Sequence, residues 1–181
     1  RRQAMHESEL KKLLEDIKSG QVGVDEAVEA FRHLPYEDMG FARIDHHRQM
    51  RCGYPEVIYC PGKATEHVVE IFARLAERGN NVLATRAERS VYEAIADSGN
   101  YEKLEYEPLG RTIVLWQKEC EPSDHFIAVV TAGTADLPVA MEAKVTAEAL
   151  GRTVRTVCDV GVSGIHRLLG SSETMETLLG A

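Results

Sequence analysis

The stretch FIAVVTAGTAD, residues 126–136, joins a continuous apolar run to a loop of small and hydroxylated residues. Five successive apolar residues at 126–130 are typical of a parallel strand that is covered on both faces. The loop Thr131–Asp136 leads into a predicted helix at 136–150, which Gly151 ends. Ligands of open α/β sheets bind outside the carboxyl ends of strands, so this loop is the first candidate binding site.

The residue types of this loop suit a phosphorylated nucleotide. Thr131 and Thr134 offer hydroxyl groups, and Gly133 lets the backbone approach a ligand closely. Asp136 is suited either to capping the helix or to binding a ribose hydroxyl, and free N–H groups at a helix start attract anions. The alternative is a simple capped turn, because Gly, Thr and Asp are common turn residues. The loop lacks the G-x-G-x-x-G dinucleotide signature.

A second candidate loop, Gly161–Arg167, follows a predicted strand at 153–157 and also enters a helix, so we expect it beside the first. His166 is the predicted catalytic residue, because imidazole transfers protons near neutral pH. Arg167 is predicted to pair with a phosphate or carboxylate of the substrate. The alternative is that both are ordinary surface residues in the first turn of a helix.

A third candidate is the segment from Asp45 to Arg51 together with Lys63. We expect Arg48, Arg51 and Lys63 near phosphates or carboxylates of an anionic substrate, the alternative being a solvated loop with one ion pair. Trp116 is a candidate for stacking on a ligand ring, although a Trp late in a strand also suits a core position.

Working outward, apolar periodicity predicts a helical pair and then alternating strands and helices. The expected helices are at 10–20, 27–34, 65–79 with Thr65 as N-cap, 91–99, 136–150 and from 165 onward; the expected strands are at 41–45, 57–60, 81–85, 104–106, 112–116, 126–130 and 153–157. The predicted domains are a helical segment at 1–35, a small mixed α/β domain at 36–121 and an α/β nucleotide-binding unit at 122–181. The predicted fold class is α/β: the last unit is a truncated, flavodoxin-like parallel sheet in three layers.

Composition limits the classes of function. The chain has 181 residues, and its net charge of −8 argues against nucleic acid as a partner. No apolar run approaches the roughly 20 residues that a membrane helix needs, so no membrane partner is expected. The four cysteines show no C-x-x-C pair and no ligand-like spacing with histidine, so no metal site is predicted and reduced thiols in a cytoplasmic protein are expected.

The three candidate segments together resemble the LarB family. The resemblance rests on DHHR (45–48) with Arg51, GYPEVIY (53–59), Gly62-Lys63, VVTAGTADLPVA (129–140) and DVGVSGIHR (159–167). Members make the pyridinium dicarboxylate precursor of the nickel-pincer nucleotide cofactor. The C-terminal unit is similar to the class I carboxylase and mutase of purine synthesis that acts on aminoimidazole ribonucleotide, whose phosphate and ribose loop corresponds to Gly133–Asp136.

This resemblance implies a nicotinic acid adenine dinucleotide carboxylase. Carbon dioxide or bicarbonate is the co-substrate, and cleavage of the phosphoanhydride releases AMP. No firm cofactor is implied, and Mg²⁺ is left open. The resemblance also implies a homo-oligomer, an octamer at full length. The alternatives are an aminoimidazole ribonucleotide carboxylase or mutase, and a non-catalytic nucleotide-binding regulator.

The same resemblance implies a catalytic thiolate that converts the electron-poor ring into an electron-rich dihydropyridine. We expect this cysteine beyond Ala181 and do not transfer its role to Cys158. The chain is therefore expected to be a fragment, inactive by itself.

Overall fold

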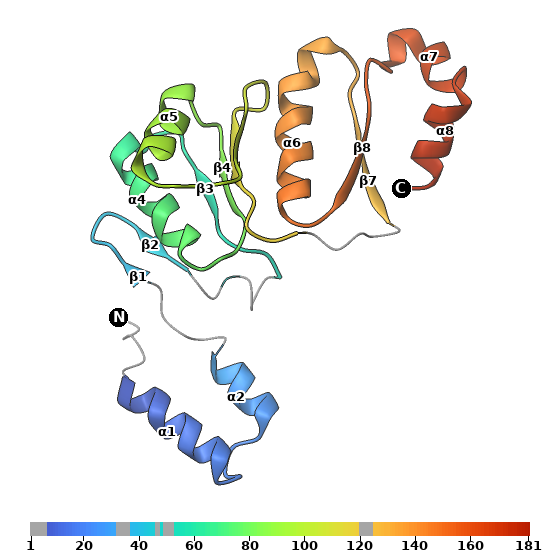
Figure 1. The fold of residues 1–181 in the computed structure, drawn as a ribbon. Helices are drawn as coiled ribbons and strands as arrows, with labels where there is room; N and C mark the ends of the chain where they lie inside the picture. Colours follow the sequence, from blue (N-terminus) through green and yellow to red (C-terminus); the bar gives the residue numbers. More distant parts are fainter. Residues whose placement is uncertain (1–6, 32–36, 46–47, 49–52, 120–124) are drawn as a thin grey trace. The chain divides into compact units, whose positions relative to one another are not determined.

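The computed structural model describes residues 7–31, 37–45, 48, 53–119 and 125–181 (Figure 1). Residue contacts divide the chain into two compact units, Arg1–Glu56 and Val57–Ala181. The domain boundaries predicted after residues 35 and 121 are not at this division and stay predictions.

The first unit holds a helical pair and a small hairpin. Its elements are α1 (Glu7–Lys18), α2 (Val24–Phe31), β1 (Glu37–Asp38) and β2 (Arg43–Ile44). Ala27 and Ile44 are its buried apolar residues among those described. The two strands are antiparallel, with Asp38 opposite Arg43. The helical pair was predicted, whereas β1 was not, because a two-residue strand has no period to detect.

The second unit begins with a four-stranded mixed sheet in the order β3-β4-β6-β5. Its elements are β3 (Val57–Tyr59), α4 (Thr65–Ala76), β4 (Val82–Thr85), α5 (Arg89–Ser98), β5 (Leu104–Glu107) and β6 (Thr112–Leu115). Strands β3 and β4 are parallel, and β6 is antiparallel to both of its neighbours. Every residue of β4 and β6 is buried, so these central strands form the core together with Phe72 of α4 and Ile95 of α5.

The start of α4 corrects one sequence prediction. Thr65 is the first helical residue, and Ala64 takes the N-cap position in an extended conformation without a side-chain cap. Thr65 was chosen because its hydroxyl suits capping. A helix capped by Thr65 would begin at residue 66, whereas α4 begins at Thr65 itself.

A two-stranded parallel sheet of β7 and β8 follows within the same unit. Its elements are β7 (Phe126–Val130), the 3₁₀ turn η1 (Thr134–Asp136), α6 (Leu137–Ala149), β8 (Thr153–Val157), the 3₁₀ turn η2 (Val162–Gly164), α7 (Ile165–Leu169) and α8 (Ser172–Leu179). Figure 1 places α6 on one side of the strands and α7 with α8 on the other. This α–β–α order and the mixed sheet before it confirm the predicted α/β fold class.

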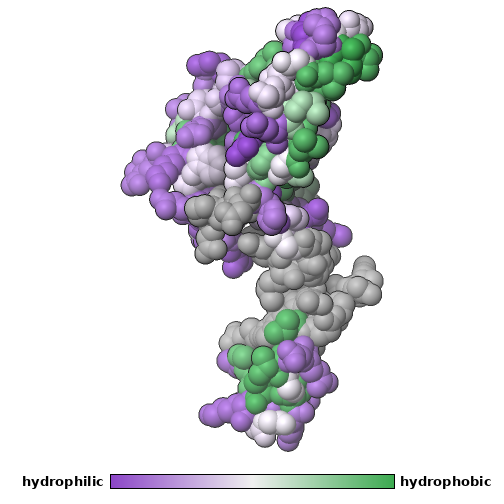
Figure 2. Space-filling view, turned by 90° about the vertical axis from the view of Figure 1, so that its right-hand side faces the viewer, coloured by the Kyte–Doolittle hydropathy of each residue, from purple (hydrophilic) through white to green (hydrophobic). Residues whose placement is uncertain are grey.

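The expectation that both faces of residues 126–130 are covered is wrong. Ile127 is 44% exposed and Val130 is 47% exposed. The reason is that β8 is the one strand that pairs with β7 in the described chain. Exposed apolar residues continue in η2 and α7 with Val162, Ile165 and Leu169. Figure 2, which faces this side, shows green apolar surface at the top.

Helix α6 belongs to both sheets of the second unit. It contacts β7 and β8 and also β4 and β6. Val145 and Ala149 pack with Leu83 of β4 and Val114 of β6. A helix with apolar residues on more than one side suits this position, because sheet strands lie on two sides of it. None of the described helices is long and apolar enough to cross a membrane.

Candidate functional site

The loops after β7 and β8 are joined at one edge of their sheet. The strands are parallel and in register from Phe126 opposite Thr153 to Val130 opposite Val157, so both end at the same edge. Thr131 donates its N–H to the carbonyl of Val157 at 2.9 Å, and its own carbonyl accepts from Val160 at 3.0 Å. The Thr131 hydroxyl accepts from the N–H of Asp159 at 3.2 Å. The predicted adjacency of the two loops is confirmed.

Gly161 is required for this close approach. Its N–H donates to the carbonyl of Ala132 at 3.0 Å. A Cβ at Gly161 would lie 2.8 Å from that same carbonyl oxygen, so any other residue would push the loops apart. Gly133 differs, because a Cβ built there meets nothing within 4 Å. The space beside Gly133 is thus open.

Asp136 organises the first loop by accepting two backbone hydrogen bonds. Its Oδ2 accepts from the N–H of Ala132 at 3.1 Å and from the N–H of Gly133 at 3.0 Å. The carboxylate of the protein itself therefore occupies these two amides, which precede the helical turn η1. The prediction that free N–H groups at the helix start attract an anion stays a prediction. Asp136 stands at the N-cap position of α6 without a side-chain hydrogen bond to that helix, and its carboxylate caps the preceding 3₁₀ turn η1 instead. Its predicted role in binding a ribose hydroxyl stays a prediction.

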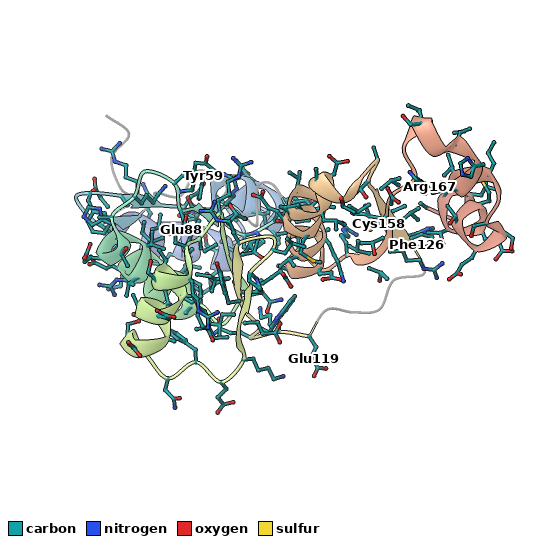
Figure 3. All side chains as sticks on the ribbon, turned by 90° about the horizontal axis from the view of Figure 1, so that it is seen from above. Tyr59, Glu88, Glu119, Phe126, Cys158 and Arg167 are labelled. Atoms are coloured by element: carbon teal, nitrogen blue, oxygen red, sulfur yellow. The ribbon has the colours of Figure 1, made fainter. Side chains whose placement is uncertain are left out.

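Arg167 and His166 lie in the first turn of α7, and both are exposed. The Nη1 of Arg167 is 3.2 Å from Oδ2 of Asp159, which follows β8. Its guanidinium also lies over Gly164, since a Cβ there would be 2.8 Å from Cζ. Arg167 is therefore held at the edge where the loops meet (Figure 3). Cys158 is exposed beside the same loop.

A second polar group gathers at the carboxyl ends of β3 and β4. Lys63 donates from Nζ to the carbonyl of Tyr59 at 2.6 Å, and this Nζ is 6.0 Å from the centroid of the Tyr59 ring. The guanidinium carbon of Arg86 is 5.6 Å from the same centroid. Nε of Arg86 is 3.2 Å from Oε1 of Glu142 in α6, and this hydrogen bond, together with the charge of Glu142, raises the pKa of Arg86. We call Tyr59, Lys63 and Arg86 the tyrosine cluster.

Tyr59 and Arg86 were missed as candidates by the sequence reasoning. Each stands at the carboxyl end of a strand in a parallel pair, which is the rule that selected Thr131–Asp136. Applying the same rule to 57–60 and 81–85 would have found both residues.

The tyrosine cluster and the joined loops lie at the same end of α6. Arg86 reaches Glu142, in the first half of this helix, and the helix begins directly after Asp136. Figure 3 places α6 between Tyr59 on one side and Cys158 and Arg167 on the other. Lys63 is therefore at the same end of α6 as the loops but on the other side of this helix.

Trp116 lies in another place. It packs against Leu83, Val114 and Ala149, near the last turn of α6, and its indole N–H donates to Oε2 of Glu105 at 2.9 Å. Thr131–Asp136 precedes the first turn of the same helix. Because α6 has 13 residues, its two ends are roughly 20 Å apart. The structure does not bring Trp116 to the loops.

The predicted residues of the first unit are described only in part. Arg48 is exposed, and its N–H donates to the carbonyl of Asp45 at 3.2 Å. The N–H of Asp45 donates to Oε2 of Glu56 at 2.6 Å. Arg51 and the pair His46-His47 lie outside the described residues, so their convergence with Lys63 stays a prediction. Among the residues that are described, no group of three or more His, Cys, Asp and Glu side chains could hold a metal ion.

Comparison with known proteins decides the family. The family model described as "LarB/PurE-like N-terminal domain" matches residues 36–118. Uncharacterized protein MJ0165 of Methanocaldococcus jannaschii is 33% identical over 174 residues, which cover 92% of this chain and 67% of that protein. The chain belongs to the LarB/PurE-like family. The resemblance predicted from the sequence is thereby confirmed, and the LarB/PurE-like family is of carboxylase and mutase type.

Proposed function

We propose that this chain recognises the dinucleotide in a nicotinic acid adenine dinucleotide carboxylase, with Thr131–Asp136 beside a ribose-phosphate group. The observation that carries the proposal is the pair of hydrogen-bonded loops, with open space at Gly133, in a LarB/PurE-like chain. Such an edge is where α/β sheets bind nucleotides. Asp136 acts as a positioning residue, because its Oδ2 fixes the two amides of the loop and its exposed carboxylate suits a ribose hydroxyl.

The proposed reaction forms one carbon–carbon bond and cleaves one phosphoanhydride. A cysteine thiolate, a role not assigned to Cys158, adds to the pyridinium ring, and a ring carbon of the resulting dihydropyridine attacks carbon dioxide, taken up directly or from bicarbonate. The same ring carbon then loses its proton and the thiolate leaves, which restores the pyridinium as the 3,5-dicarboxylate. Water cleaves the phosphoanhydride, and AMP leaves. His166 is proposed to take up the proton, as neutral imidazole can. Arg167 and Lys63 are proposed to hold substrate anions, and Arg86 joins them on the strength of its place beside Tyr59.

Titration calorimetry of the chain with nicotinic acid adenine dinucleotide tests recognition separately from turnover. We expect Asp136→Ala to weaken binding about tenfold, because the loop loses a charged acceptor of two hydrogen bonds. Asp97→Ala, which removes an exposed carboxylate from α5, is the matched control and should leave the affinity unchanged. Equal affinity of Asp136→Ala and the unaltered chain would count against the loop.

A turnover assay distinguishes the alternatives. Labelled bicarbonate should enter a dicarboxylated mononucleotide, detected by mass spectrometry together with AMP, in the longest form of the protein that can be expressed. Carboxylation of aminoimidazole ribonucleotide instead would favour the purine-type enzyme, which the PurE-like part of the family description brings into consideration. Tight dinucleotide binding without either product would favour a regulator. A homo-octamer at full length and a cytoplasmic location remain part of the proposal, and Mg²⁺ is left open.

A further inference from the structure

A groove runs between α6 and the edge of the four-stranded sheet, away from the joined loops. A helix about 10 Å wide covers about two strands, because strands lie about 4.8 Å apart. The main contacts of α6 with this sheet are to β4 and β6, so the edge strand β5 is left beside the helix. The resulting pocket has a volume of about 770 Å³. Its walls include Lys103, Glu105, Trp116, Lys118, Glu148 and Arg152.

Trp116 supplies an aromatic wall to this groove. Its indole N–H is already bonded to Glu105, so the remaining surface of the side chain is the apolar ring. The side chain is half-buried between the core and the groove. Such a ring is suited to stacking on a planar ligand.

A smaller cavity adjoins the groove and contains an unpaired hydroxyl. It has a volume of about 200 Å³ and shares Glu105, Trp116 and Glu148 with the groove. Thr112 also lines it, is 0% exposed, and has no hydrogen-bond partner for Oγ1 among the described residues. A buried hydroxyl without a partner is destabilising, so a polar ligand group that reaches Thr112 would be held there.

The charged side chains that line the groove suit a ligand with an anionic group and a neutral ring. Lys103, Lys118 and Arg152 supply positive charge at the wall of the groove, and Glu105, Glu119 and Glu148 supply negative charge there. Glu148 stands between groove and cavity, and burial raises its pKa, an effect that Lys144 partly opposes. The inner part therefore disfavours a second charge, and Lys103 and Arg152 are the groups of the wall that would bind a ligand anion.

We propose that the groove beside Trp116 is a second ligand site, for a small planar heteroaromatic molecule that carries one phosphate or carboxylate. The ring stacks on Trp116 and its polar edge bonds to the Thr112 hydroxyl, while Lys103 and Arg152 bind the anionic group. The site lies at the far end of α6 from Thr131–Asp136 and does not depend on the proposed function. Figure 3 likewise shows Glu119, another residue of the groove, apart from Cys158 and Arg167.

The single tryptophan of the chain makes the test direct, because Trp116 is the only source of indole fluorescence. Titration with AMP and with nicotinate should give saturable quenching by at least one of them, and the tighter ligand identifies phosphate or carboxylate as the anion. Adenosine and nicotinamide, which lack the charge, should bind about tenfold more weakly. No saturable quenching, or equal quenching by the neutral compounds, would overturn the proposal.

Variants separate the groove from the loops. Arg152→Gln should weaken binding about tenfold, whereas Asp136→Ala should leave it unchanged. The reverse pattern would place the ligand at the loops and overturn the proposal. Thr112→Val keeps the shape of the side chain and should weaken binding several-fold while the protein stays folded by circular dichroism. Unchanged affinity of Thr112→Val would overturn the placement of the ring against this hydroxyl.

Discussion

Strands β6 and β7 are both short and largely apolar, yet they differ completely in burial. All four residues of β6 are buried, whereas none of the five residues of β7 is. Strand β6 lies between β4 and β5 and under α6, whereas in the described chain β7 pairs with β8 only. The comparison teaches that an apolar run specifies a strand, and that its neighbours decide how much free energy its burial contributes.

The largest expected effect contrasts the same substitution in these two strands. Ile113→Ala in β6 should lower the free energy of unfolding by about 2–5 kcal/mol, because its side chain is fully buried and leaves a cavity. Ile127→Ala in β7 should cost about 1 kcal/mol or less, since its side chain is nearly half-exposed and contributes less burial. Denaturant unfolding of both variants measures the difference. Equal losses would mean that β7 is covered in solution.

A smaller change in stability tests the contact between the four-stranded sheet, which contains β6, and helix α6, which packs on β7. The turn between β5 and β6 approaches α6 so closely that a Cβ at Gly110 would lie 2.8 Å from the backbone nitrogen of Glu142. Gly110→Ala should destabilise the second unit by about 1–3 kcal/mol and increase hydrogen exchange in α6, because the helix must shift. Gly133→Ala is the control, since that position has open space and an extended backbone. Wild-type stability of Gly110→Ala would show that α6 is not docked there.

The smallest effect concerns two thiols at equivalent positions. Cys60 and Cys158 each directly follow a parallel strand, but Cys60 is buried and Cys158 exposed. Burial raises the pKa of Cys60 from 9.0 to about 11, although Lys63 and Arg111 oppose the shift. Iodoacetamide should therefore label Cys158 before Cys60, as peptide mass spectrometry would show.

The raised pKa of Cys60 also determines how the stability of the protein changes with pH. Above pH 9 the unfolded thiol loses its proton while the folded Cys60 keeps it, so stability falls as the pH rises from about 9 to about 11. Cys60→Ala should make this fall shallower. A fall that is unchanged in this variant would assign the effect to other groups.

Local sequence patterns predicted much of the fold. Helices and strands of four or more residues have a measurable period, and parallel strands necessarily bring their following loops to one edge. The junction of Thr131 with Asp159 could be foreseen in this way. The two-residue strand β1 offers too little period to be defined, whereas β2 lies within the strand predicted at 41–45.

What could not be predicted depends on contacts between distant residues. Arg86 is positioned by Glu142, which is 56 residues away. Trp116 is directed to the groove by the packing of α6 on β4 and β6, and no local motif encodes that packing. Asp136 could have been assigned by its own chemistry, because an acidic side chain at the third position of a helical turn reaches back to the N–H of the N-cap residue, here Gly133.

The tyrosine cluster has a consequence for the entropy of binding. Long cationic side chains normally lose rotational freedom when they close on an anion, and this loss weakens association. Lys63 is tethered to the Tyr59 carbonyl, and Arg86 rests on the Tyr59 ring while bonded to Glu142. Much of their motion is therefore already restricted before any ligand arrives. An anion that binds at this end of α6 would therefore lose less free energy to the ordering of these two cations, because folding has already ordered them.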